Sequence, residues 1–141
     1  MLSIYPACFF KESNGYSVIF PDLNYLATCG STIDEALEMA VDCLAGYIHS
    51  EKMEGESIPV ASGIQSVDAE AVGKELDIDA TECFVNLVTV DVDEYSKLHF
   101  EKPVKKTLTI PSWLNDTAQE KNINFSAVLQ EALKAKLRVQ K

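Results

Sequence analysis

The sequence predicts an α+β fold in two parts: an antiparallel sheet with one covering helix, then a short strand-helix-helix tail. Two observations lead to this prediction. Strand-like runs between residues 2 and 29 are separated by tight-turn residues, and a long amphipathic helical pattern follows directly. Much later, a short alternating run, a proline and two more helical patterns close the chain. At 141 residues, the length suits one ordinary domain, or a smaller domain with a mini-domain attached.

The charge divides at the same place as the pattern. The chain has a formal charge of −10, but residues 1–102 hold five basic and nineteen acidic side chains, a net −14. Residues 103–141 hold seven basic and three acidic side chains, a net +4. Such asymmetry suggests a basic partner for the body and a polyanion for the tail.

The first elements form a hairpin. Residues 2–10 (LSIYPACFF) are rich in strand-forming side chains, and Asn14-Gly15 is a strong tight-turn pair. Residues 16–20 (YSVIF) supply the second strand. A Pro-Asp turn then breaks the run, residues 25–29 supply a third strand, and a glycine ends it.

A helix is predicted over residues 32–52. Thr32 followed by Glu35 has the spacing of a capping box, in which two side chains satisfy free N–H groups of the first turn. The helix has an apolar stripe that should lie on the sheet: Ile33, Leu37, Ala40, Val41, Leu44 and Ile48. Its acidic residues lie mostly off that stripe, and form either a solvated face or an interaction surface: Asp34, Glu35, Glu38 and Asp42.

The middle of the chain is less regular. Residues 55–79 read as a long connection with one short helical piece. Residues 83–92 (CFVNLVTVDV) are largely apolar at both alternate sets of positions, which predicts a central strand covered on both faces. Residues 91–103 are charged and turn-like, and residues 99–103 within them are the predicted linker.

The tail alternates cleanly over residues 104–110. Leu108 and Ile110 point to one side, and Lys105, Thr107 and Thr109 to the other, as the two-residue period of a strand requires. A helix is predicted over residues 111–121, started by Pro111 and stopped by Asn122. Either Ser126 or Asn124 caps a second helix. That helix has its own apolar stripe: Phe125, Val128, Leu129, Ala132, Leu133 and Leu137.

The tail is too small to be stable alone. Units below ~40 residues usually need a metal, disulfides or a partner chain, and residues 103–141 offer no metal or disulfide pattern. Dimerisation remains, with the lone strand pairing with its copy. A two-stranded ribbon fits the DNA major groove, and Lys105, Thr107 and Thr109 of both chains would face it. The N-terminus of the second helix would offer N–H groups to a phosphate, which adds Asn124 and Ser126 to the candidates.

No cofactor, metal site or membrane span is expected. The four cysteines are widely spaced without a CxxC pair, and neither histidine lies within four residues of one, so reduced thiols in a cytoplasmic protein are predicted. No apolar run approaches ~18 residues. The first residues lack the basic segment of a secretory signal.

The tail resembles the ribbon-helix-helix fold of bacterial repressors. More specifically, KKTLTIPSWLNDTAQEKNINFSAVLQEALKAKL is similar to the C-terminal domain of HicB-type antitoxins. The first half agrees with that family's pattern at several short motifs: YPA from Tyr5, GY from Gly15, FPDL from Phe20, TCGST from Thr28, EA from Glu35 and LVTVD from Leu87. The family usually continues FPDL with Pro-Gly-Cys, where this chain has Asn24-Tyr25-Leu26.

The resemblance implies two tasks. A partial RNase H-like N-terminal domain (residues 1–98) would bind and block a small, basic, mRNA-cleaving HicA-type toxin. Residues 104–141 would form a ribbon-helix-helix homodimer that binds operator DNA and represses the operon, with pairing of dimers into tetramers left open. Candidate toxin contacts are Asp22, Glu35, Glu38 and Asp42.

Two alternatives stay open from the residues alone. The first is a solitary repressor whose N-terminal domain senses another ligand or protein. The second is a metal-dependent RNase H-like nuclease, because such enzymes gather carboxylates around Mg²⁺. Capping explains the first-turn acids of the helix, a turn explains Asp22, and a −14 body would repel a nucleic acid. The chain is therefore predicted not to be an enzyme.

Overall fold

The computed structural model describes residues 1–138, and the last three residues of the predicted 104–141 domain lie outside the described residues. The chain divides into two compact units, Met1–Lys102 and Pro103–Lys141. The first, here called the body, contains every strand of the described chain. The second, here called the tail unit, contains two helices.

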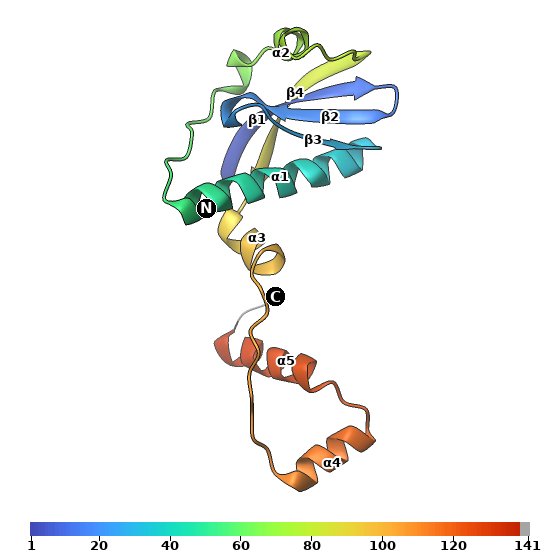
Figure 1. Cartoon of the computed structure of the whole chain (residues 1–141), viewed down its shortest axis with the longest axis vertical. Helices are drawn as coiled ribbons and strands as arrows, with labels where there is room; N and C mark the ends of the chain where they lie inside the picture. Colours follow the sequence, from blue (N-terminus) through green and yellow to red (C-terminus); the bar gives the residue numbers. More distant parts are fainter. Residues whose placement is uncertain (139–141) are drawn as a thin grey trace. The chain divides into compact units, whose positions relative to one another are not determined.

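The body is built on a four-stranded antiparallel sheet in the order β3-β2-β1-β4 (Figure 1). The strands are β1 (Ser3–Glu12), β2 (Gly15–Phe20), β3 (Leu26–Gly30) and β4 (Glu82–Val90). The predicted hairpin and third strand are confirmed. The α+β class, with an antiparallel sheet and a covering helix, is confirmed as well.

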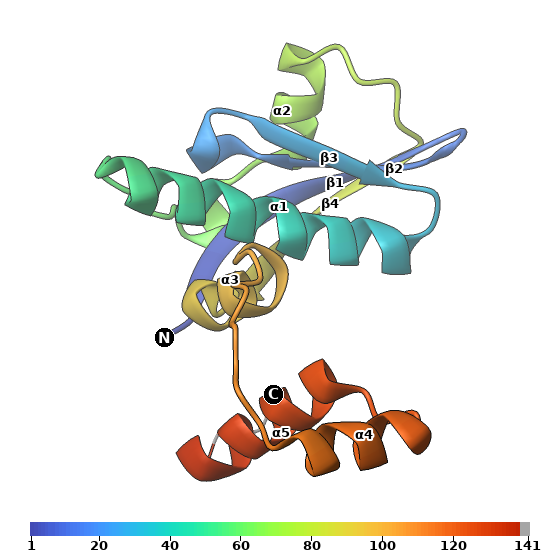
Figure 2. The same ribbon diagram turned by 60° about the horizontal axis from the view of Figure 1, so that its bottom comes forward.

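Helix α1 (Ile33–Glu54) covers one face of the sheet, and α2 (Ala69–Glu75) lies on the other (Figures 1 and 2). The predicted cap is present, because the Glu35 N–H donates to Thr32 Oγ1 at 3.2 Å. The Glu35 carboxylate accepts from the N–H of Ser31, one residue before the cap, at 2.9 Å. The short helical piece expected within residues 55–79 is α2, preceded by a 3₁₀ turn η2 (Ile64–Ser66).

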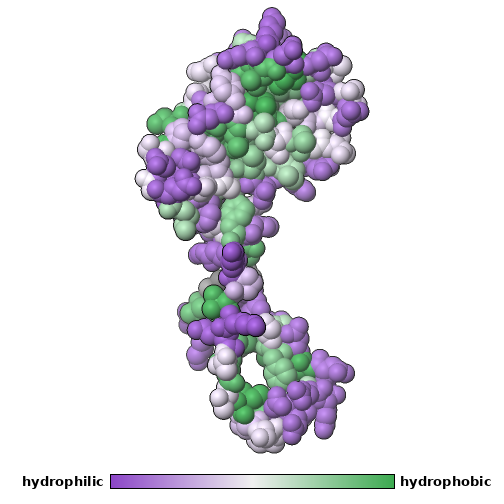
Figure 3. Space-filling view, viewed as in Figure 1, coloured by the Kyte–Doolittle hydropathy of each residue, from purple (hydrophilic) through white to green (hydrophobic). Residues whose placement is uncertain are grey.

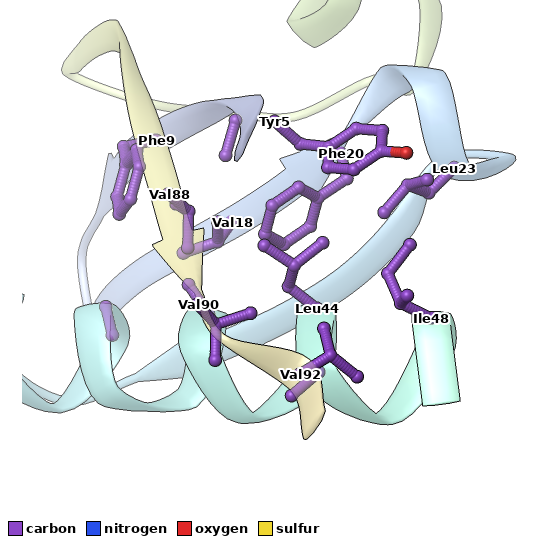
Figure 4. Packing of buried hydrophobic residues seen from close by; sticks show 14 residues of the cluster. Tyr5, Phe9, Val18, Phe20, Leu23, Leu44, Ile48, Val88, Val90 and Val92 are labelled. Carbon is purple, nitrogen blue, oxygen red and sulfur yellow. The ribbon is translucent and has the colours of Figure 1, made fainter. Parts of the chain in front are cut away.

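Two cores lie on the two faces of the sheet. The larger joins α1 to β1, β2 and β4 (Figure 4), with Phe9, Phe20 and Leu44 fully buried. The smaller lies under α2 and contains Cys8, Phe10 and Ile19 among others. The two central strands, β1 and β2, each contribute alternate side chains to both cores, so both are covered on both faces.

The prediction for residues 83–92 is therefore wrong about position. Strand β4 is at the edge of the sheet, paired only with β1 among the described residues. Apolar residues at both alternate sets of positions suggested that both faces of the strand are buried, but Phe84 is 40% exposed and Leu87 is 43% exposed. Only Val88 and Val90 are buried.

The turn-like assignment of residues 91–103 is also wrong. Asp91 caps an additional helix, α3 (Val92–His99), by accepting from the Glu94 N–H at 3.2 Å. Val92 is buried against α1, and the helix belongs to the body. Its length of eight residues and its exposed charges hid the helical pattern.

In the tail unit, the helices are α4 (Ser112–Glu120) and α5 (Phe125–Leu137), close to the predicted spans. Asn122 has a φ of 54°, which confirms the left-handed stop. Asn124 rather than Ser126 caps α5, with its side chain accepting from the Ala127 N–H at 3.1 Å. Residues 104–110 form no strand, because a strand needs a hydrogen-bonded neighbour and the described chain supplies none there.

Candidate functional site

Two acidic residues of α1, Glu35 and Asp42, have hydrogen-bond partners within the body. The Tyr95 hydroxyl of α3 donates to Asp42 Oδ1 at 2.9 Å, which holds α3 against α1. Glu35 is engaged in the cap described above. Glu38, one turn before Asp42, is exposed. Two of the predicted toxin contacts therefore also maintain the fold of the body.

Asp22 serves a different structural purpose. It lies in the 3₁₀ turn η1 (Pro21–Leu23), and its two carboxylate oxygens accept from Ser62, at 2.8 Å from the N–H and 2.7 Å from the hydroxyl. This contact fastens the long connection to the sheet. The side chain of the neighbouring Asn24 donates a hydrogen bond to the Tyr47 hydroxyl, so this turn lies near Tyr47 of α1. Tyr47 is about three helical turns after Glu35, or roughly 18 Å along the helix axis. The four candidates therefore do not form one cluster.

Helix α3 adds acidic groups beside α1 that the sequence analysis did not assign. Asp93 and Glu94 are exposed in its first turn, and Asp93 pairs with Lys52 at 3.6 Å. Burial, the hydrogen bond to Asp42 and the charges of Asp42 and Glu38 raise the pKa of Tyr95 to about 12. Burial is the largest of these causes, and the carboxylates of Asp42 and Glu38 add negative charge beside the hydroxyl. The Asp91-x-x-Glu94 spacing of a capping box was the sequence signal for this helix.

Among residues 1–138, no group of three or more His, Cys, Asp or Glu side chains has an arrangement that could hold a metal ion. No helix of the described chain is both long and apolar enough to cross a bilayer. Glu35 instead caps α1, and Asp42 and Asp22 hold α3 and the long connection in place.

The tail unit has no buried residue within its described part, 103–138. Hydrophobic side chains lie at the surface of this unit in the face shown in Figure 3. Ten large apolar side chains are 41–80% exposed: Val104, Leu108, Ile110, Trp113, Leu114, Ile123, Phe125, Val128, Leu133 and Leu137. So much exposed apolar surface on so small a unit indicates that a partner covers it.

The predicted DNA contacts lie in two places of the tail unit. Lys105, Thr107 and Thr109 are exposed in the segment that has no regular structure. Asn124 and Ser126 are brought together at the start of α5, where they line an open hollow of about 290 Å³ that also includes Lys134. Their side chains are bonded locally, Asn124 to the Ala127 N–H and Ser126 to the Gln130 amide.

The sequence and the fold of this chain were compared with those of known proteins. The sequence model described as HicB_like antitoxin of bacterial toxin-antitoxin system matches residues 4–73. A chain of a toxin-antitoxin complex from Streptococcus pneumoniae is 35% identical, with 96% of this chain and 99% of that one covered and a TM-score of 0.62. The chain belongs to the HicB-like antitoxin family. The match to the pneumococcal chain covers the tail unit as well as the body.

Solved structures that carry the name HicB are less similar to this chain. The Burkholderia pseudomallei antitoxin HicB is 22% identical, with 93% of this chain and 96% of that one covered and a TM-score of 0.48. Its N-terminal domain alone is 23% identical, covers 63% of this chain and 99% of that one, and has a TM-score of 0.44. No curated protein matches the sequence.

Proposed function

We propose that this HicB-like antitoxin binds and neutralises a small, basic, mRNA-cleaving toxin of the HicA type through its body. We propose further that its tail unit forms a ribbon-helix-helix dimer that binds operator DNA and represses the operon. The observation that carries the proposal is the 35% identity to a chain of the pneumococcal toxin-antitoxin complex over 96% of the sequence. The charge division supports it, since the body carries −14 and the tail +4.

The toxin contact is assigned to the exposed acids where α1 and α3 meet, and Glu38 is its most informative member. Glu38 is exposed and accepts no cap hydrogen bond, whereas Glu35 and Asp42 also hold the fold. A basic toxin would be drawn to this surface by long-range attraction, and close charge pairs would then set how long it stays.

The test is whether this chain inhibits the cleavage of RNA by a small, basic HicA-type toxin. Wild-type antitoxin should block cleavage at equimolar concentration, and the antitoxin alone with Mg²⁺ should leave RNA intact. Glu38→Lys should weaken inhibition about tenfold or more through charge reversal. The matched control is Asp79→Lys, the same charge change in the exposed loop before β4, which should inhibit normally. Equal effects of the two variants would contradict the assigned surface.

DNA binding is assigned to the outward side of residues 104–110 and to the start of α5. In a paired ribbon, Lys105, Thr107 and Thr109 of both chains would lie on one face, and the N–H group of Ser126 would meet a phosphate. The double variant Thr107→Ala/Thr109→Ala should weaken binding to the DNA upstream of the gene without changing the dimer. Wild-type affinity should fall steeply with added salt, because lysines displace counterions. Unchanged affinity in a salt-controlled gel shift would refute this face.

A further inference from the structure

Strand β4 leaves one edge of the sheet open. It pairs with β1 in nine consecutive residue pairs, from Ser3 opposite Val90 to Lys11 opposite Glu82. On its other side no strand lies within the described chain, and no backbone hydrogen bond from residues 82–90 is found there other than those of the β1 ladder. Its outer N–H and C=O groups are therefore available to another strand.

This edge lacks the features that usually protect edge strands. Natural proteins shorten such strands or place lysine, proline or a bulge in them. Strand β4 is nine residues long (ECFVNLVTV), has neither lysine nor proline, and carries its one charge at the first residue, Glu82. Phe84 and Leu87 add exposed apolar side chains. The opposite edge, β3, is only five residues long and ends in a glycine.

We propose that β4 pairs with β4 of a second copy, antiparallel about a two-fold axis through Asn86, which joins two sheets into one of eight strands. Asn86 is the midpoint of residues 82–90, so this register overlaps the whole strand. Each side chain also stays on its own face of the sheet, as alternation requires. Phe84 then lies opposite Val88, and Val85 opposite Leu87.

The side chains favour this register over its neighbours. With the axis at Asn86, the two amides face each other and can exchange hydrogen bonds, while the flanking pairs are apolar on both sides. With the axis at Val85, Asn86 would face Phe84; with the axis at Leu87, it would face Val88. Either shift by one residue therefore sets an amide against an apolar side chain.

Charge favours a second copy over the basic toxin as the occupant of this edge. The body carries −14, so two bodies repel wherever acids face each other. Along β4 the only acid is Glu82, and in this register it faces Val90 rather than its own copy. A basic partner would gain little electrostatic attraction from so neutral a strand. An identical strand in this register places no like charges opposite each other.

The contact is separate from the pairing of tail units, so each copy would have two places of self-association. Two dimers formed through the tails could then join through β4 into a dimer of dimers. That larger assembly rests on the proposed tail dimer, but the β4 contact itself does not.

The experiment is sedimentation of the full-length chain over a concentration series, with charges placed at the axis. Asn86 is exposed, so Asn86→Lys and Asn86→Asp should fold normally. Each variant alone sets like charges opposite each other and should weaken the association step roughly tenfold. An equimolar mixture of the two variants should restore it, because lysine then faces aspartate. Ala27→Lys on the exposed part of β3 is the matched control and should associate like wild type.

Three results would overturn the inference. The first is a wild-type mass that is no larger than the mass of Asn86→Lys at any concentration. The second is equal behaviour of Asn86→Lys and Ala27→Lys. The third is unchanged self-association of Asn86→Lys together with lost toxin inhibition, which would assign the edge to the toxin. Inhibition and gel-shift assays on the same samples separate failure of this contact from failure of the proposed function.

Discussion

Leu108 offers the most direct test of how the tail unit becomes stable. Its side chain is 61% exposed in the single chain and lies on the side of residues 104–110 assigned to the ribbon's inner face. Fully burying a leucine is worth about 1.5–3 kcal/mol, so the exposed part offers about 1–2 kcal/mol per chain. Because a symmetric dimer buries two copies, Leu108→Ala should cost about 2 kcal/mol or more per dimer, even with the alanine methyl retained. This corresponds to a roughly thirtyfold rise in the dimer dissociation constant.

The measurement is sedimentation equilibrium of full-length protein carrying Asn86→Lys, so that the β4 contact contributes less. Thr107→Ala is the matched control, one residue away on the opposite side of the segment, and should leave the dissociation constant within about twofold of the parent because it faces away from the partner chain. If both substitutions weaken the dimer equally, the two faces are misassigned. If neither does, residues 104–110 do not form the dimer contact.

Two further predictions concern the body. Tyr95→Phe removes the hydrogen bond to Asp42 and should lower the free energy of unfolding by about 1–2 kcal/mol in urea titrations, most of it from loosening α3. Folding raises the pKa of Tyr95 to about 12, so the stabilisation from its hydroxyl is complete below pH 10 and is lost as the pH rises from 10 towards 12. Tyr95→Phe should lack this part of the alkaline decline in the free energy of unfolding. An identical decline in the variant and the wild type would contradict the argument. Gly30→Ala should destabilise by about 3 kcal/mol in thermal melts, because the new Cβ would lie 2.4 Å from the backbone nitrogen of Ala36. Gly63→Ala, whose nearest atom would be 3.8 Å away, should melt like wild type.

Local signals in the sequence located most elements of the body. The tight turn that joins β1 to β2 just before Gly15 and the cap at Thr32 depend only on residues a few positions apart, and both are present. The sequence indicated only one of the two roles of Gly30. It ends β3 as expected, but the close approach of α1 at Ala36 is what leaves no room for a side chain. Packing between elements is not written in the spacing of one element.

The wrong position of β4 and the unforeseen roles of the carboxylates share that origin. The sequence of an apolar strand such as β4 is the same whether the strand lies at the centre or at the edge of a sheet, because its position depends on which strands pair with it. The bonds from Asp22 to Ser62 and from Tyr95 to Asp42 join residues 40 and 53 positions apart, beyond any local pattern. These contacts show that carboxylates read as candidate toxin contacts also hold the connection and α3 in place. Charge patterning alone could not separate the two roles.

The two units differ in what they need to be complete, and this bears on regulation. The body has two cores within a single chain, whereas the described tail unit has no buried side chain at all. Under the proposed function, toxin binding therefore requires only one chain, while operator binding requires two. By mass action, dilution below the dissociation constant of the tail dimer should release DNA and still leave the toxin inhibited. The chain's concentration would then control repression separately from neutralisation, without any change in the structure of the body.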